Sequence, residues 1–211
     1  MAYRRTPAVQ ARLDAQREAV LQAAVELLAE HGYGGCSVAA VARRAKIATG
    51  SVYQHFGGKA ELSVVLFRTV VEREVAAVGE AVADAADRGE GPHGRVAAVV
   101  RTFAARALKA PRLAYALLVE PADPVVDAER LVFRRAFRDL FAEQIRAAIA
   151  TGQLPHQDAE LTAAALVGAV GEALVGPLAA GSDPDDVIPA LVSFAQRALG
   201  AEQGDKATRS S

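Results

Sequence analysis

The stretch from Ser37 to Leu62, SVAAVARRAKIATGSVYQHFGGKAEL, decides the expected fold of this 211-residue chain. Ser37 is suited to cap a first short helix that runs to about Ala45. A brief turn at 46–48 leads to a second short helix that ends near Phe56. Two helices of about eight residues joined by so short a turn must cross steeply, which is typical of a helix-turn-helix motif.

The apolar and polar side chains of this stretch separate onto two faces. The core is expected to form against a first helix over 12–31, from Val41, Ile47, Val52 and Phe56 with Leu21, Ala24 and Leu28. Hydrogen-bonding side chains then remain on the exposed start and face of the second short helix: Thr49, Ser51, Tyr53, Gln54 and His55. In the major groove, such a helix reaches base edges while neighbouring groups hold phosphates. The pattern therefore predicts a DNA-binding surface.

This segment resembles the DNA-binding module of TetR-family transcriptional regulators. The resemblance begins in the first helix, covers about 50 residues, and is carried by Ala42, Ala45, Ile47, the run Gly50–Phe56 and the run Lys59–Leu62. The length of the chain and the number of expected helices extend it to the whole sequence.

The resemblance implies a role for each matching residue. Tyr53 is expected to contact phosphate, His55 to lie at the groove, and Lys59 to anchor the DNA backbone from the start of the next helix. Gln54 can offer a bidentate pair to adenine. The remaining matching positions approach bases or phosphate, and they are Ser37, Thr49, Gly50 and Ser51.

Two residues depart from the family pattern. The family usually has Gly where this chain has Lys46, and a left-handed backbone there costs Lys roughly 1 kcal/mol while adding a cation near DNA. A Ser or Thr cap is common where this chain has Ala48. If Thr49 supplied the cap instead, the second short helix, which is the expected recognition helix, would begin one residue later.

Simpler roles remain open for single residues of this segment. Tyr53 could be a packing aromatic and His55 a solvated or core histidine. Cys36 is expected to be a small packing residue rather than a redox sensor. The other histidines are scattered without ligand spacing, so no metal site, cofactor or catalytic site is expected.

Helical periodicity dominates the whole chain and predicts an all-α protein of about nine helices. The expected domains are a helix-turn-helix DNA-binding domain at 1–60, a helical ligand-binding and dimerisation domain at 61–200, and a flexible tail at 201–211. Beyond the motif, Gly and Pro punctuate expected helices at 59–88, 95–109, 112–120, 125–150, 158–180 and 185–199, with a loop at 89–94.

The charge of the chain divides along the same boundary. The formal net charge is −1, but residues 1–60 hold eight Lys or Arg against four acids, and residues 61–211 hold 16 against 21. A basic unit on an acidic body is typical of a nucleic-acid-binding module carried by another domain. A random fluctuation in charge is the alternative.

The body is expected to bind an effector and to dimerise. The resemblance implies a four-helix dimer interface from the segments at 158–180 and 187–199, with an ordinary intrachain core as the alternative. Candidate cavity residues are Phe103, Arg106, Tyr115, Leu118, Phe133, Phe137, Arg138 and Phe141. A plain core with snorkelling arginines would use the same residue types.

Composition excludes several other classes of protein. The chain has one Cys, no signal-peptide core and no window of 18 uncharged apolar residues, so neither a disulfide scaffold nor a membrane protein is expected. The sequence predicts a cytoplasmic, homodimeric, ligand-responsive repressor that binds a pseudo-palindromic double-stranded DNA operator. A helical enzyme or a protein-interaction module without DNA binding is the alternative.

Overall fold

The computed structural model describes residues 6–200, and this range contains nine α-helices and no strand. The predicted all-α fold is therefore confirmed. The helices are α1 (Pro7–Gly35), α2 (Val38–Arg44), α3 (Thr49–His55), α4 (Lys59–Asp87), α5 (Pro92–Lys109), α6 (Pro111–Leu118), α7 (Pro124–Ala150), α8 (Ala159–Ala180) and α9 (Pro184–Ala198).

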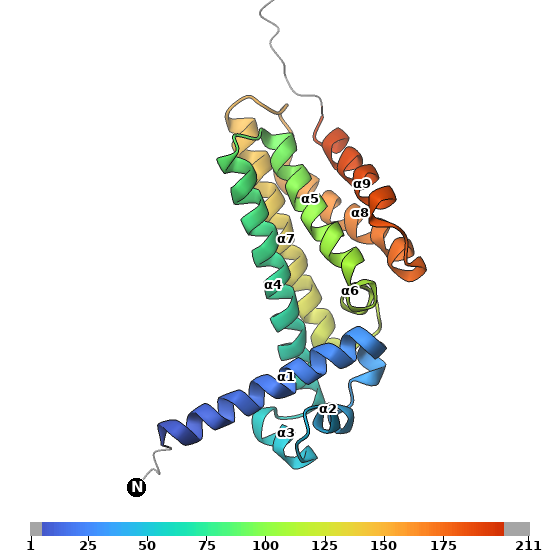
Figure 1. Ribbon diagram of the computed structural model, residues 1–211. Helices are drawn as coiled ribbons and strands as arrows, with labels where there is room; N and C mark the ends of the chain where they lie inside the picture. Colours follow the sequence, from blue (N-terminus) through green and yellow to red (C-terminus); the bar gives the residue numbers. More distant parts are fainter. Residues whose placement is uncertain (1–5, 201–211) are drawn as a thin grey trace, which may run out of the picture.

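Helices α1 to α3 and the start of α4 surround one hydrophobic core. Val41, Val52 and Phe56 are at most 1% exposed, as predicted, and Ile47 packs against them half-buried. Gly32 interrupts α1 with a positive φ of 66°, a conformation that glycine adopts without strain. These three helices form the lower end of the molecule (Figure 1).

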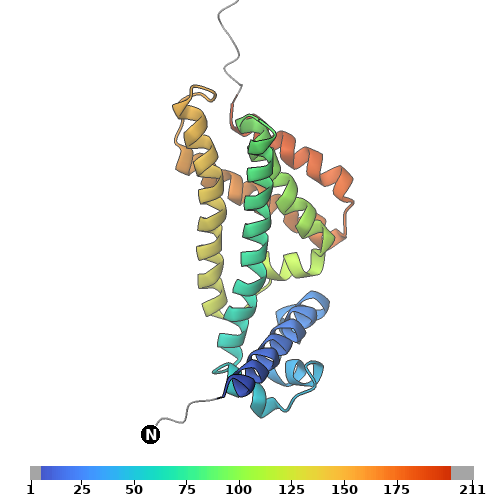
Figure 2. The same ribbon diagram turned by 60° about the vertical axis from the view of Figure 1, so that its left-hand side comes forward.

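A second core holds the remaining helices together. The long helices α4 and α7 lie side by side and carry the body away from the amino-terminal domain (Figures 1 and 2). Helices α5, α8 and α9 complete the body, and short α6 lies against the end of α1. Because α4 begins in the amino-terminal domain and continues through the body, the predicted boundary at residue 60 falls within a continuous helix.

Several helix ends differ from the sequence-based expectation. Helix α1 begins at Pro7 rather than near Arg12, with Thr6 as its cap. Helix α5 begins at Pro92, inside the expected loop, because proline is well suited to the first helical position. The tail predicted at 201–211 lies outside the described residues.

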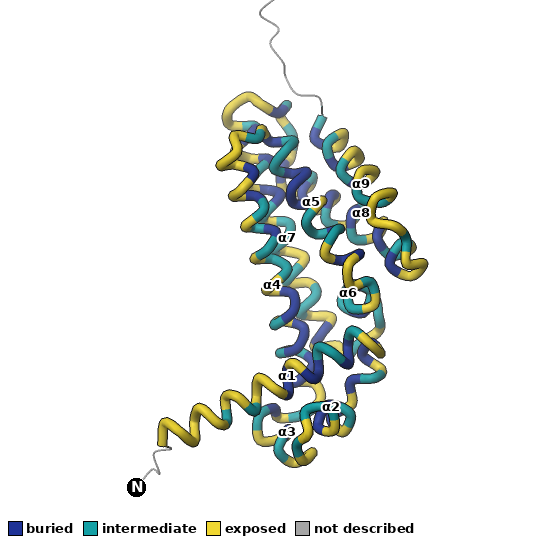
Figure 3. Tube along the Cα trace, viewed as in Figure 1, coloured by how far each residue is buried: buried dark blue, intermediate teal, exposed yellow. Residues whose placement is uncertain are grey.

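Helix α8 has the most apolar sequence of the body. By length and composition alone Ala159–Ala180 could cross a membrane, which is weak evidence, and only 28% of its most apolar window is buried. Figure 3 shows exposed positions along α8 and α9 on the outer side of the body. Leu161 on α8 and Phe194 on α9 are the large apolar side chains that these helices expose.

Candidate nucleic-acid interface

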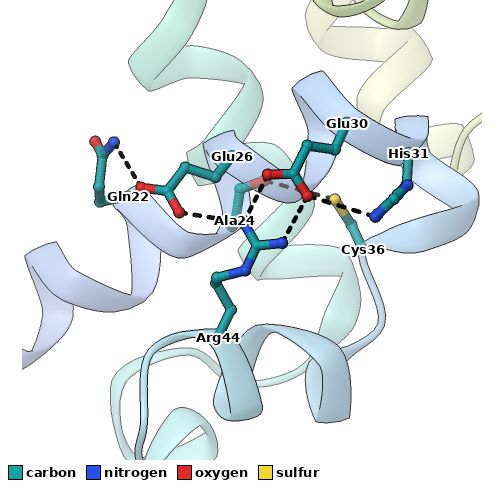
Figure 4. A network of polar contacts seen from close by, with 7 residues as sticks. All are labelled: Gln22, Ala24, Glu26, Glu30, His31, Cys36 and Arg44. Atoms are coloured by element: carbon teal, nitrogen blue, oxygen red, sulfur yellow. Dashed lines mark hydrogen bonds and ion pairs between the residues drawn. The ribbon is translucent and has the colours of Figure 1, made fainter.

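Helix α2 is fixed at both ends. The hydroxyl of Ser37 caps it by accepting a hydrogen bond of 3.1 Å from the amide of Ala40. At the other end, the Arg44 guanidinium donates to Glu30 at 2.6 and 2.9 Å and to Glu26 at 3.2 Å (Figure 4). These bonds lower the pKa of the Glu30 carboxyl. Arg44 therefore holds α2 against α1, and its positive charge is paired with carboxylates of the same domain.

Lys46 turns the chain between α2 and α3 in a left-handed conformation, with φ 57°. It is the one non-glycine residue with positive φ in the described part of the chain. The turn is closed by the Ile47 amide, which donates to the carbonyl of Ala42 at 3.0 Å. The left-handed backbone expected here is confirmed, and the Lys46 side chain is exposed.

Helix α3 presents its polar side to solvent. Ala48 occupies the cap position without a side-chain bond and Thr49 is the first helical residue, so the one-residue shift caused by a Thr49 cap is wrong. Val52 is 1% exposed, whereas Tyr53 on the other side is 55% exposed. Tyr53 is therefore not a core aromatic.

Side chains of α1 hold the end of α3 in place. His55 Nε2 lies 3.1 Å from Gln16 Oε1, within hydrogen-bonding distance. The guanidinium of Arg17 lies over the Phe56 ring, 5.1 Å from its centroid. The motif alone could not reveal Gln16 and Arg17, because no local pattern relates them to residues almost 40 positions later.

Lys59 is the first residue of α4, immediately after the Gly57–Gly58 break. The Glu61 carboxylate accepts a hydrogen bond of 2.7 Å from the amide of Gly57, which fixes the start of the helix. The Lys59 side chain is exposed.

The structure brings the nine residues predicted at the DNA face to one end of the molecule, at the cap of α2, in the turn after it, in α3 and at the start of α4. Ser51 and His55 are half-buried. The exposed members are Ser37, Lys46, Thr49, Gly50, Tyr53, Gln54 and Lys59. Two short helices joined by a tight turn, with a buried apolar side and an exposed polar side on the second, have the architecture of a helix-turn-helix motif.

A cavity of about 250 Å³ lies in the body, walled by α4 to α8. Phe103 and Phe137 meet edge to face there, with ring centroids 5.2 Å apart. Of the predicted cavity residues, the structure brings together Phe103, Arg106, Leu118, Phe133, Phe137 and Phe141.

Two predicted cavity residues lie elsewhere. Tyr115 packs against the core of the body rather than lining the cavity. Arg138 points to the surface, where it pairs with Asp139 at 2.7 Å and Glu160 at 3.5 Å. Arg106 does line the cavity but is bonded to the Glu74 carboxylate, which raises the pKa of the guanidinium.

Residues suited to metal binding do not cluster within residues 6–200, where no group of three His, Cys, Asp or Glu side chains is found. Cys36 is buried, and its thiol donates to the carbonyl of Ala24 at 3.6 Å. Burial raises the pKa of Cys36 to about 11. This is the environment of a packing residue rather than a reactive thiolate.

Comparison with known proteins relates this domain to a known family. Residues 20–64 match the family described as "Bacterial regulatory proteins, tetR family". The HTH-type transcriptional repressor Rv3405c of Mycobacterium tuberculosis is 40% identical over 81 residues, which are 38% of this chain and 43% of that protein. This chain therefore spans less than half the length of that relative.

Solved structures extend the likeness to the whole fold. The fatty acid degradation regulator FadR of Bacillus halodurans superposes with a TM-score of 0.71 at 19% identity, over 94% of this chain and 97% of that one. FadR of Bacillus subtilis, solved with stearoyl-CoA, gives 0.71 at 17% identity, over 87% and 97%. Residues 20–64 thus match the tetR family, and the chain as a whole has the fold of these solved regulators.

Proposed function

We propose that this chain is a DNA-binding transcriptional regulator, a cytoplasmic and ligand-responsive repressor that acts as a homodimer. The observation that carries the proposal is the exposed polar side of α3, with Tyr53 and Gln54 outside and Val52 and Phe56 in the core. Lys46 and Lys59 flank that helix as exposed cations. Such a surface reads base edges in the major groove and holds phosphates on either side.

A two-fold symmetric dimer would read a pseudo-palindromic operator. Its two recognition helices must stand about 34–36 Å apart, or a multiple of that distance, to enter successive major grooves. The exposed apolar surface of α8 and α9 supports dimerisation through these helices. Both helices are far from α3, so the DNA face stays free (Figure 1).

The cavity supports a small apolar effector. Aromatic and aliphatic side chains dominate its lining, and its volume of about 250 Å³ lies near the lower end of ligand sites. An effector that favours a dimer with the wrong helix spacing lowers operator affinity. A coupling of about 1–3 kcal/mol corresponds to a loss of roughly 5- to 150-fold.

The decisive experiment begins with capture of the genomic DNA fragments that the protein binds. Gel shifts on a captured operator at several salt concentrations then compare wild type with Lys59→Ala. We expect Lys59→Ala to weaken binding to all sequences alike and to flatten the salt slope by about one unit. Lys109→Ala is the matched control, because Lys109 is equally exposed but lies at the end of α5, in the body.

Base reading is tested on the same fragment. Gln54→Ala and Thr49→Ala should alter the preference among operator variants, because both side chains are exposed on α3 and are proposed to meet bases. The proposal fails if no fragment is enriched, or if Lys59→Ala, Tyr53→Phe and His55→Ala all leave operator affinity unchanged.

A further inference from the structure

A single arginine of α7 closes the carboxyl end of α6. The Arg130 guanidinium donates to the carbonyls of Ala116 and Leu117, each at 2.9 Å, and to that of Glu120 at 2.6 Å. The last carbonyls of a helix have no partner within it, so they need donors from elsewhere. Only 14% of the Arg130 side chain is exposed, and such charge-assisted bonds are strong in a partly buried setting.

The same group touches the DNA-binding domain. The Arg130 guanidinium lies 5.9 Å from the ring centroid of Tyr33, a residue of α1 that is 6% exposed. Beside it, the Glu120 carboxylate lies against Gly32, at the place that a Cβ atom would occupy. The end of α6 and the end of α1 are therefore held together through Arg130 and Glu120.

Arg130 also belongs to the wall of the cavity, next to Phe133 and Phe137 on the same helix. No described hydrogen bond or ion pair of the other charged side chains of the wall reaches α6 or α1. The pair of Arg106 and Glu74 joins α5 to α4 within the body, and no described residue pairs with Arg134. Of the charged residues described in the wall, Arg130 is the one that is bonded to the carboxyl end of α6 and also packs on α1.

We propose that Arg130 is the positioning residue through which occupancy of the cavity reaches the DNA-binding domain. This proposal rests on the ligand-responsive function proposed above. A ligand with a hydrogen-bond acceptor at this end of the cavity takes the guanidinium from the α6 carbonyls and frees the end of α6. The position of Tyr33, and with it the angle of α1 and the recognition helix, then changes.

Hydrogen exchange of the full chain tests the link without knowledge of the ligand. In Arg130→Gln, amides at 117–120 should exchange at least about tenfold faster, because the end of α6 loses its charged donors. Amides at 29–35 of α1 should accelerate with them. Arg135→Gln is the matched control, since Arg135 is an exposed residue of α7 outside the cavity wall, and it should match wild type.

Acceleration in α6 with unchanged α1 would make Arg130 a local cap and overturn the proposal. Should Arg130→Gln fail to fold, Tyr33→Leu tests the same link from α1, with Tyr33→Phe as the variant that keeps the ring. Tyr33→Leu should accelerate exchange at 117–120 and Tyr33→Phe should not. Equal rates of exchange at 117–120 in Tyr33→Leu and Tyr33→Phe would also overturn the proposal.

The captured operator fragment provides an independent arm that separates this proposal from the proposed function. Linkage is reciprocal, so DNA bound at α3 should slow exchange at 117–120 in wild type and less so in Arg130→Gln. DNA that binds without changing exchange in α6 contradicts the role of Arg130 and leaves the regulator intact. Failure of DNA to bind contradicts the proposed function itself.

Discussion

Lys46 combines a strained backbone with a useful charge. Its φ of 57° places it in the left-handed region, where a side chain costs about 1 kcal/mol, yet its exposed ammonium stands beside the recognition helix. Glycine would relieve the strain and remove the charge. Stability and DNA affinity are therefore expected to change in opposite directions at this one position.

We expect Lys46→Gly to raise the free energy of unfolding by about 1 kcal/mol and to weaken operator binding. Lys46→Ala is the matched variant, because it removes the same charge but keeps a Cβ in the strained turn. It should weaken DNA binding equally without the gain in stability. Urea denaturation and gel shifts measure the two effects, and equal stability of both variants would contradict the role of strain.

The thiol of Cys36 should be unreactive while the chain is folded. Burial raises its pKa to about 11, so very little thiolate is present at pH 8. We expect a thiol-alkylating reagent to react with Cys36 at pH 8 far more slowly in the native protein than in urea. Rapid native alkylation would show that the end of α1 opens frequently.

The same shift has a consequence for alkaline stability. A folded pKa above the ordinary value of 9 stabilises the native state fully below pH 9. That contribution is lost as the pH rises from about 9 to about 11. Cys36→Ser lacks a thiol that titrates in this range and should show a smaller fall in stability there.

Helix α2 shows how a basic residue of the motif can be structural. Arg44 is bonded to Glu26 and Glu30, whereas Lys59 is exposed and has no described hydrogen bond or ion pair. We expect Arg44→Gln to lower the urea midpoint but to leave the salt slope of DNA binding unchanged, in contrast to Lys59→Ala. A slope reduced by one unit in Arg44→Gln would place Arg44 on DNA instead.

The contact between Arg44 and Glu30 should weaken at acidic pH. The bond to Arg44 lowers the pKa of Glu30, so its stabilisation is present above the ordinary value of 4.5 and lost as the pH falls through the lowered pKa. Arg44→Gln removes the cause of that shift. Its stability should therefore fall less than that of wild type over the same acidic range.

Local chemistry made most helices of this fold predictable. The Ser37 cap and the apolar spacing of Val52 and Phe56 depend on neighbours in sequence, and the structure confirms both. The start of α5 was misplaced because the Gly-rich residues before Pro92 resemble a longer loop.

Contacts between helices were not predictable in the same way. The pairing of His55 with Gln16 and of Arg130 with the α6 carbonyls depends on crossing angles that no local pattern encodes. For the same reason Arg138, one residue after cavity-lining Phe137, points away from the cavity to Asp139 and Glu160. The spacing of apolar residues showed which face of a helix is buried, but it did not show which residue of another helix contacts that face.

The charge division of the chain acquires a structural meaning in the assembled molecule. Residues 1–60 hold four acids, and two of them, Glu26 and Glu30, are bound to Arg44 at the contact of α1 with α2. Lys46 and Lys59, which flank α3, keep their charges exposed. Positive potential is thereby concentrated where DNA is proposed to bind.

Assembly is expected to use α8 and α9, whose outer side carries large exposed apolar residues. Leu161 on α8 is 68% exposed and Phe194 on α9 is 41% exposed. Burial of apolar area contributes about 25 cal/mol per Å², and a charge at such an interface is costly. We therefore expect Phe194→Glu and Leu161→Glu to shift the protein from dimer to monomer in sedimentation experiments.

Leu131→Glu is the matched control for this interface. Leu131 is 58% exposed but lies on α7, near the end of the body that faces the DNA-binding domain. It should leave the dimer intact. Because a monomer contacts only one half-site, the two interface variants should also lose operator affinity while retaining the native helical content measured by circular dichroism. A dimer that persists in both Phe194→Glu and Leu161→Glu would place the interface on another face of the body.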